Sequence, residues 1–175
     1  SYTVSLLRPE VIADLGLKRH GVEFIPYRGA LELLDTGEVV QFTGEEIHDQ
    51  AQVARFSNRD WDSLKRLRAK LARVGDIVRD QILRPPPDLA GGWDALWSSV
   101  RIGAKARKLD VEERLFLTQL FTLSADELMG RWFESEPMRH IMAVHCVSSN
   151  YASLRQPGSA IPFFLNVLGE LDGRR

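Results

Sequence analysis

The sequence predicts a mostly helical α+β fold in which short N-terminal strands, arranged as a hairpin, precede a bundle of helices. Short apolar runs broken by turn residues occupy residues 22–42, whereas apolar residues recur at every third or fourth position from residue 44 onward. Several of the helical stretches begin with a Ser or Asp that suits an N-terminal cap. The 175 residues, of which 44% are hydrophobic, are enough for one domain with its own core.

The first predicted elements are a helix and a strand. Residues 8–17 are expected to be helical, because Pro9 is tolerated in a first turn and Gly16 suits a helix end. Residues 22–27 are expected to form an edge strand or the end of a strand, since Pro26 cannot donate a hydrogen bond within a sheet.

A β-hairpin is predicted next. Residues 30–34 and 38–42 are apolar runs on either side of residues 35–37, whose Asp-Thr-Gly sequence is typical of a tight turn. Three short strands are too few for a self-sufficient sheet, so we expect these strands to have partners elsewhere.

Two helices are predicted before the triproline at residues 85–87, which should end the second of them. Residues 45–55 form the first, with Ile47, Ala51 and Ala54 expected on its buried face. The second starts after Ser57 as its cap. Its apolar residues are spaced by three or four, and they are Trp61, Leu64, Leu67, Leu71, Val74, Val78 and Ile82.

Further helices are predicted in the second half of the chain, the first over about residues 93–109. Residues 147–158 are polar and loop-like, while the apolar run at residues 161–168 suits either a helix or a strand. Three more helices begin at cap-like sequences, which start with Asp110, Ser124 and Ser135.

Charge and composition argue against several classes of protein. The 23 Lys and Arg residues are balanced by 24 Asp and Glu residues, so the overall charge does not favour nucleic acid as a partner. No apolar run approaches the ~20 residues that cross a bilayer, so no transmembrane segment is expected. The lone cysteine, Cys146, has no partner for an internal disulfide, which favours a cytoplasmic location.

The search for catalytic groups finds no strong motif. No Gly-x-Gly-x-x-Gly sequence is present, so the phosphate-binding turn of a dinucleotide site is missing. His140 and His145 would lie about 140° apart on a helix, which is a poor arrangement for sharing a metal. Cys146 and His145 are adjacent and point in different directions, which disfavours a nucleophilic pair. We therefore predict no catalytic, cofactor-binding or metal-ligating residue.

Seven blocks of sequence are spread over nearly the whole chain, at residues 1–17, 20–23, 56–60, 124–128, 132–137, 151–160 and 168–173. Together they resemble the phytoene-desaturase-like flavoproteins, and within that family they are most similar to the branch called pyridine nucleotide-disulfide oxidoreductase domain-containing proteins. The blocks keep their order along the chain, which makes the resemblance more specific than any block alone.

The resemblance implies a Rossmann-type flavin domain that is split in sequence by a substrate domain, and residues 1–175 would belong to the substrate domain. The flavin fingerprint of the family would then precede Ser1, and a second flavin segment would follow Arg175. FAD is accordingly expected in the intact parent protein but not in this chain, whose partner would be the missing flavin-binding domain. The longer protein would be cytoplasmic or, as an alternative, peripheral to a membrane.

A substrate-binding domain of an FAD-dependent oxidoreductase, inactive alone, is therefore the expected function. It would orient an apolar substrate for hydride transfer to the flavin. The alternatives are a non-catalytic helical interaction module derived from the same fold and, less well supported by the histidine spacing, a metal-dependent hydrolase. Aromatic residues in the resembling blocks and around the Pro157-Gly158 turn are the candidates for a substrate pocket, with core packing as their alternative role: Trp132, Phe133, Tyr151, Phe163 and Phe164.

Overall fold

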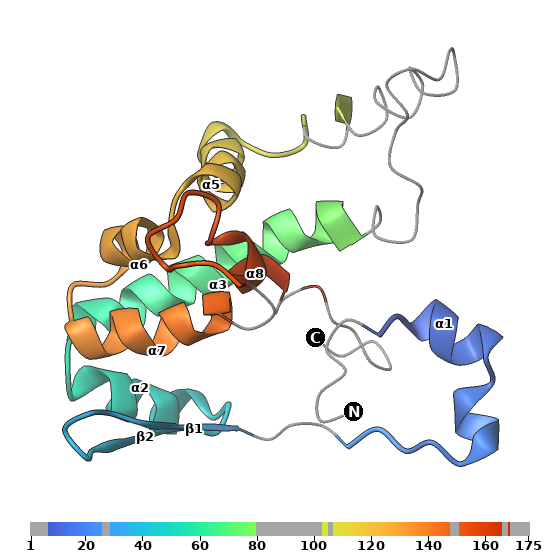
Figure 1. The fold of residues 1–175 in the computed structure, drawn as a ribbon, viewed down its shortest axis with the longest axis horizontal. Helices are drawn as coiled ribbons and strands as arrows, with labels where there is room; N and C mark the ends of the chain where they lie inside the picture. The colour runs from blue at the N-terminus through green and yellow to red at the C-terminus, as the bar shows by residue number, and fades with distance from the viewer. Residues whose placement is uncertain are drawn as a thin grey trace.

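The computed structural model describes residues 7–25, 29–79, 103–104, 107–147, 151–165 and 168. It confirms the mostly helical α+β fold, in which a two-stranded hairpin lies below a group of packed helices (Figure 1). The long helix α3 (Asn58–Arg79) crosses the middle of this group. Helices from both sides of it in the sequence pack against it, so α3 is the element that organises the rest.

The N-terminal helix is confirmed, and it lies apart from the main helical group (Figure 1). It consists of α1 (Pro9–Asp14), followed by the short 3-10 helix η1 (Leu17–His20). Gly16 separates the two with a φ of 59°, a left-handed conformation that glycine adopts without steric cost. The strand predicted to follow is wrong for residues 22–25, which pair with no strand among the described residues. An apolar run without a neighbouring strand has no hydrogen-bonded ladder to join.

The predicted hairpin is confirmed. Its strands β1 (Ala30–Leu33) and β2 (Val39–Phe42) are antiparallel. Gly37 turns the chain with a φ of 82°, and its N–H donates to the carbonyl oxygen of Leu34 at 2.8 Å. Val40 on the inner face of the hairpin is completely buried.

Helix α2 (Glu46–Ala54) is confirmed, but the face predicted to be buried is wrong. Ile47 is 87% exposed, whereas Asp49 and Val53 are buried. The reason is a hydrogen bond at the start of the helix, where Asp49 Oδ1 accepts the backbone N–H of Thr43 at 2.8 Å. Because this bond ties Asp49 to the end of β2, the adjoining face turns inward and Ile47 turns to solvent.

The periodic stripe on α3 forms the centre of the core. Ser57 caps the helix as predicted, since its Oγ accepts the backbone N–H groups of Arg59 and Asp60 at 3.1 and 3.2 Å. The predicted end at the triproline lies outside the described residues, as does most of the helix predicted over residues 93–109. Residues 103–104 of that segment are helical, whereas residues 107–109 form a turn and a bend, so the predicted helix end at residue 109 is wrong. The buried members of the stripe are Trp61, Leu64, Leu67, Leu71 and Val74.

Three helices follow at the three predicted starts, and the predicted side-chain caps are confirmed at the first two of them. They are α5 (Val111–Thr122), α6 (Ala125–Trp132) and α7 (Glu136–Val147). Asp110 and Ser124 form capping boxes at α5 and α6, in which each cap and the Glu three residues later satisfy each other's backbone N–H. The last helix, α8 (Ile161–Leu165), shows that the ambiguous apolar run is helical over residues 161–165, while residues 166 and 167 lie outside the described residues.

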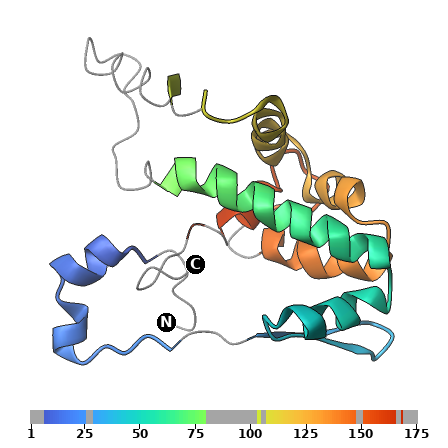
Figure 2. The ribbon, with the colours of Figure 1, turned by 180° about the vertical axis from the view of Figure 1, so that it is seen from behind.

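The helices form a layered body in which α3 covers α7 and α8 when the molecule is seen from behind (Figure 2). The loop-like residues before α8 dock on the start of α6, where the Asp126 N–H donates to the Leu154 carbonyl oxygen at 3.0 Å. The Gly158 N–H likewise donates to the Leu123 carbonyl oxygen at 3.0 Å. Within the described part of the chain, no helix has the length and apolarity needed to cross a membrane.

Candidate ligand-binding pocket

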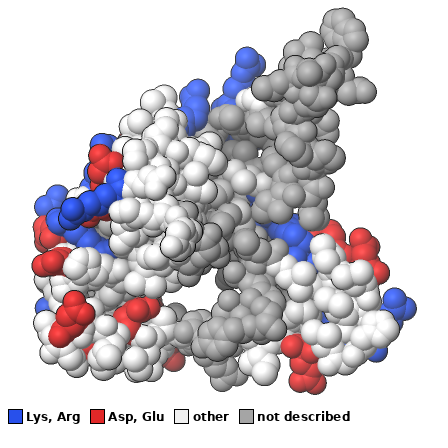
Figure 3. All heavy atoms as spheres, viewed as in Figure 1, with Lys and Arg blue, Asp and Glu red and all other residues white. Residues whose placement is uncertain are grey.

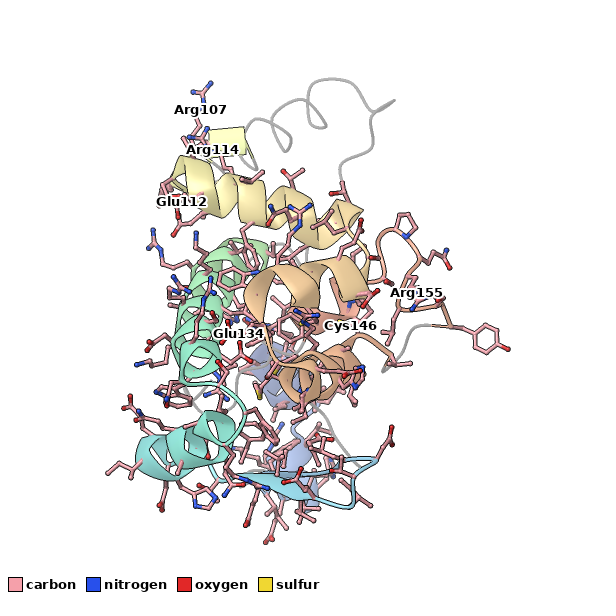
Figure 4. The ribbon with its side chains drawn as sticks, turned by 90° about the vertical axis from the view of Figure 1, so that its left-hand side faces the viewer. Arg107, Glu112, Arg114, Glu134, Cys146 and Arg155 are labelled. Carbon is pink, nitrogen blue, oxygen red and sulfur yellow. The ribbon has the colours of Figure 1, made fainter. Side chains whose placement is uncertain are left out.

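A hollow of about 580 Å³ opens between α3, the start of α5, the end of α6 and α7. Figure 4 looks towards this side of the molecule and labels Glu112 on α5 and Glu134 after α6, two of the acidic side chains that border the hollow. In Figure 3, Lys and Arg side chains gather with a few acidic ones along the left edge of the helical group. Most of the residues that line the hollow are charged, and Trp132 and Phe133 are its aromatic members.

One face of α3 supplies most of the basic wall. Arg59, Ser63, Arg66 and Lys70 follow each other at intervals of three or four residues, so they lie in a row along the helix. This row runs beside the buried apolar stripe of the same helix. The pocket consequently depends on the packing that holds α3 against α5 and α6.

Two of the basic side chains are paired with carboxylates. Lys70 Nζ lies 2.7 Å from an oxygen of Glu112, which joins α3 to α5. Arg59 lies 3.2 Å from an oxygen of Glu134, whose other oxygen accepts the hydroxyl of Ser57 at 2.6 Å. Exposed pairs of this kind contribute little to stability, but they fix where the two acidic groups lie.

Asp60 has a structural role at the back of the pocket. Its side chain is 1% exposed, and its two oxygens accept the backbone N–H groups of Glu134 and Ser135 at 2.8 and 3.0 Å. The hydroxyl of Ser135 donates to the same carboxylate. Asp60 thus holds the connection that enters α7, and its carboxylate accepts hydrogen bonds from these three donors.

Two of the five predicted aromatic residues border this pocket. Trp132 is half-buried and meets the ring of Phe116 edge-on, with centroids 5.6 Å apart and an interplanar angle of 79°. Phe133 also borders the hollow, but only 1% of its surface is exposed. Trp132 is therefore the aromatic side chain here with surface available to a ligand.

The other three predicted residues lie elsewhere. Phe163 and Phe164 belong to α8 and are 4% and 3% exposed, which places them in the core. Tyr151 is fully exposed. None of the three borders the pocket, so within the described residues the predicted set does not come together as one cluster.

His145 and Cys146 are adjacent in α7, and burial shifts the pKa of each side chain. Burial lowers the pKa of His145, whose ring lies 6.2 Å from that of Phe163. Burial raises the pKa of Cys146 to about 11, against an ordinary value of 9.0. A thiol with a raised pKa is a weak nucleophile at neutral pH, so Cys146 has the properties of a core residue.

Cys146 is accordingly expected to resist thiol reagents in the folded chain. The raised pKa leaves about a hundredfold less thiolate at pH 8 than an ordinary cysteine has, and burial also blocks access. A disulfide reagent added at pH 8 should therefore react slowly with the native chain and release one equivalent of thiol in denaturant. Since this is the lone cysteine, the signal is unambiguous. Rapid reaction of the native chain would show that the Cys146 thiol is accessible to the reagent.

The described residues were compared with what a metal ion or a flavin dinucleotide needs. No group of three or more His, Cys, Asp or Glu side chains is placed to hold a metal ion within that part of the chain. A flavin dinucleotide needs a glycine-rich turn between a strand and a helix, and the sequence lacks that motif. This chain therefore offers no glycine-rich turn to hold the pyrophosphate of FAD.

The site residues predicted from the sequence are all aromatic, and they include none of the basic residues of α3 that border this pocket. The pattern that could have revealed the pocket is the row of Arg59, Ser63, Arg66 and Lys70, at intervals of three and four beside the apolar stripe. The pattern does not indicate which residues line the pocket opposite α3. Glu112, Glu134 and Trp132 come from segments that are distant in sequence, and the fold brings them to α3.

Comparison with known proteins supports a relationship to oxidoreductase-domain proteins. The chain is 28% identical over 189 aligned residues to pyridine nucleotide-disulfide oxidoreductase domain-containing protein 2 of Rattus norvegicus, and 26% identical to that of Mus musculus. Each alignment covers 99% of this chain and 32% of the relative, so the chain spans about a third of their length. The sequence matches no family model, and no solved structure matches it.

Proposed function

We propose that this chain is the substrate-side domain of a larger FAD-dependent oxidoreductase and has no redox activity alone. The observation that carries the proposal is the alignment of the whole chain with only 32% of an oxidoreductase-domain protein. The lack of a glycine-rich fingerprint agrees with it, because the flavin would then be held by a separate domain of the same protein.

In this proposal the chain binds and orients an apolar substrate for hydride transfer to that flavin. Trp132 supplies the apolar surface, since its ring is partly accessible while contact with Phe116 fixes its plane. Phe133, the next residue along the chain, is buried in the core. The chain would contribute position and exclusion of water, which agrees with the lack of a candidate acid or base among the predicted site residues.

Sequencing the gene on both sides of residues 1–175 tests the proposal directly. A glycine-rich Gly-x-Gly-x-x-Gly segment encoded upstream is the expected result, and the purified chain should carry no flavin absorbance. A start codon immediately before Ser1, with a stop codon after Arg175, would rule out a flavin domain in the same polypeptide.

Trp132→Ala in the flavin-loaded longer protein should raise KM about three- to tenfold with kcat little changed, because the lost contact is made equally in the ground and transition states. The control is Phe121→Ala, which removes an aromatic ring that is 51% exposed and does not border the pocket. Steady-state kinetics of the two variants give the comparison. Unchanged kinetics with a lower melting temperature would assign Trp132 to the core alone.

A helical interaction module remains the second candidate, and the hairpin favours it. Leu31, Leu33 and Val39 are 64%, 71% and 42% exposed, and the cross-strand pairing of Leu33 with Val39 puts apolar side chains next to each other on the outer surface. A longer protein that contains no flavin after purification but captures a protein through this face would support the module. Redox turnover with bound flavin would support the oxidoreductase.

A further inference from the structure

The charges around the pocket are not balanced. Five basic and three acidic side chains border it, which leaves an excess of two positive charges. The acidic groups are already engaged, since Glu112 pairs with Lys70, Glu134 pairs with Arg59, and Asp60 accepts three hydrogen bonds. Three guanidinium groups border the hollow without an ion pair to any described carboxylate: Arg66, Arg131 and Arg139.

Two of these groups are held in place by neutral acceptors. Arg139 donates from Nε to the Phe133 carbonyl oxygen at 2.7 Å and from Nη2 to the Glu134 carbonyl oxygen at 3.2 Å. Arg66 donates to the hydroxyl of Ser63, which is itself buried, at 3.2 Å. These contacts orient the guanidinium groups without neutralising them.

Arg131 is the most weakly engaged of the three. The pKa of Glu127, four residues earlier, is lowered chiefly by hydrogen bonds with Ser124, and the attraction of Arg131 is the smallest of the causes. Its guanidinium group is exposed and borders the hollow at the end of α6, immediately before Trp132. A cation next to an accessible indole is suited to a ligand with both an anionic and a flat apolar part.

We propose that this pocket binds a phosphate ester whose organic part carries a flat ring, with the phosphate at Arg66 and Arg131 and the ring against Trp132. A phosphate monoester carries a charge of about −1.5 to −2 at pH 7, which matches the excess positive charge of the pocket. Its several oxygens accept from more than one guanidinium group, which a single carboxylate does less well. Binding does not depend on the proposed redox role of the longer protein.

Calorimetric titration of the 175-residue chain with adenosine 5′-monophosphate tests this proposal, with adenosine and inorganic phosphate as the two partial ligands. The nucleotide should bind at least about tenfold more tightly than either part, because only it reaches both the guanidinium groups and the indole. The affinity should fall as salt is raised, since both arginines are exposed.

Variants decide whether the binding is at this pocket. Arg66→Gln combined with Arg131→Gln should weaken nucleotide binding about tenfold or more, because two charge-assisted contacts are lost. Arg107→Gln, an exposed arginine away from the pocket and labelled in Figure 4, is the matched control and should change the affinity less than about twofold. Circular dichroism should show both variants folded, because neither changes a buried side chain.

Three outcomes would overturn the proposal. They are no binding of the nucleotide, equal binding of the nucleotide and adenosine, and an equal loss of affinity in the control variant, which would indicate unspecific attraction to positive charge. None of these outcomes bears on flavin content or turnover of the longer protein. The two proposals can therefore fail separately.

Discussion

Phe133→Ala should lower the free energy of unfolding by about 3–5 kcal/mol, the usual cost of removing a fully buried aromatic ring. Only 1% of the side chain is exposed, and it packs with residues of α3, α6 and α7 in the central cluster. The loss should be visible in urea unfolding as a lower midpoint with an unchanged slope. Phe133→Leu, which keeps most of the volume, should cost less.

Phe121→Ala is the control for this prediction. It removes the same ring from α5, where the side chain is 51% exposed, and it should cost less than about 1 kcal/mol. If Phe133→Ala proved as mild as the control, Phe133 would face the pocket and not the core. That result would return it to the substrate-contacting role that the sequence predicted.

The helices were predictable because their signals are local. Asp110 and Ser124 each lie three residues before a glutamate, and both form the capping boxes that this spacing indicates. The stripe on α3 is equally local, since a period of three to four residues puts Leu64, Leu67 and Leu71 on one face of any helix. Such patterns depend on backbone geometry and not on distant partners.

The orientation of α2 was not predictable in the same way. Its sequence offers two weakly apolar faces, and the face with Ile47 is the more hydrophobic by composition. The choice is made by Asp49, whose hydrogen bond to Thr43 reaches back to the preceding strand and commits the opposite face to the core. A buried carboxylate on the inner face of a helix cannot be anticipated from periodicity.

The pocket, like the orientation of α2, could not be predicted from local sequence patterns. Arg66 and Arg131 are 65 positions apart in the sequence, so their approach depends on how α6 packs against α3. Trp132 could be singled out from sequence as an aromatic residue near the end of a helix. Only the fold shows that guanidinium groups without an ion pair to a described carboxylate border the same hollow, and this is why we propose a ligand that is anionic as well as apolar.

Asp60→Ala should destabilise the chain by about 2–4 kcal/mol, because it removes the acceptor for the two backbone N–H groups and the hydroxyl at the entrance to α7. The carboxylate is 1% exposed, so water cannot easily replace it. Asp60→Asn should be harmful as well. The amide of asparagine keeps one acceptor oxygen, but its NH2 group replaces the other oxygen. That group is a donor and lies where the neighbouring N–H and O–H groups need an acceptor.

Asp62→Ala is the matched control, two residues along the same helix. Its carboxylate is 69% exposed and pairs with Lys65 at 3.2 Å on the surface, so its loss should cost less than about 0.5 kcal/mol. Urea unfolding of the variants gives the comparison. Similar losses for Asp60 and Asp62 would mean that α7 is held by its apolar contacts alone. A large difference would show that one buried carboxylate on α3 fixes the start of α7, and with it the Arg139 side of the pocket.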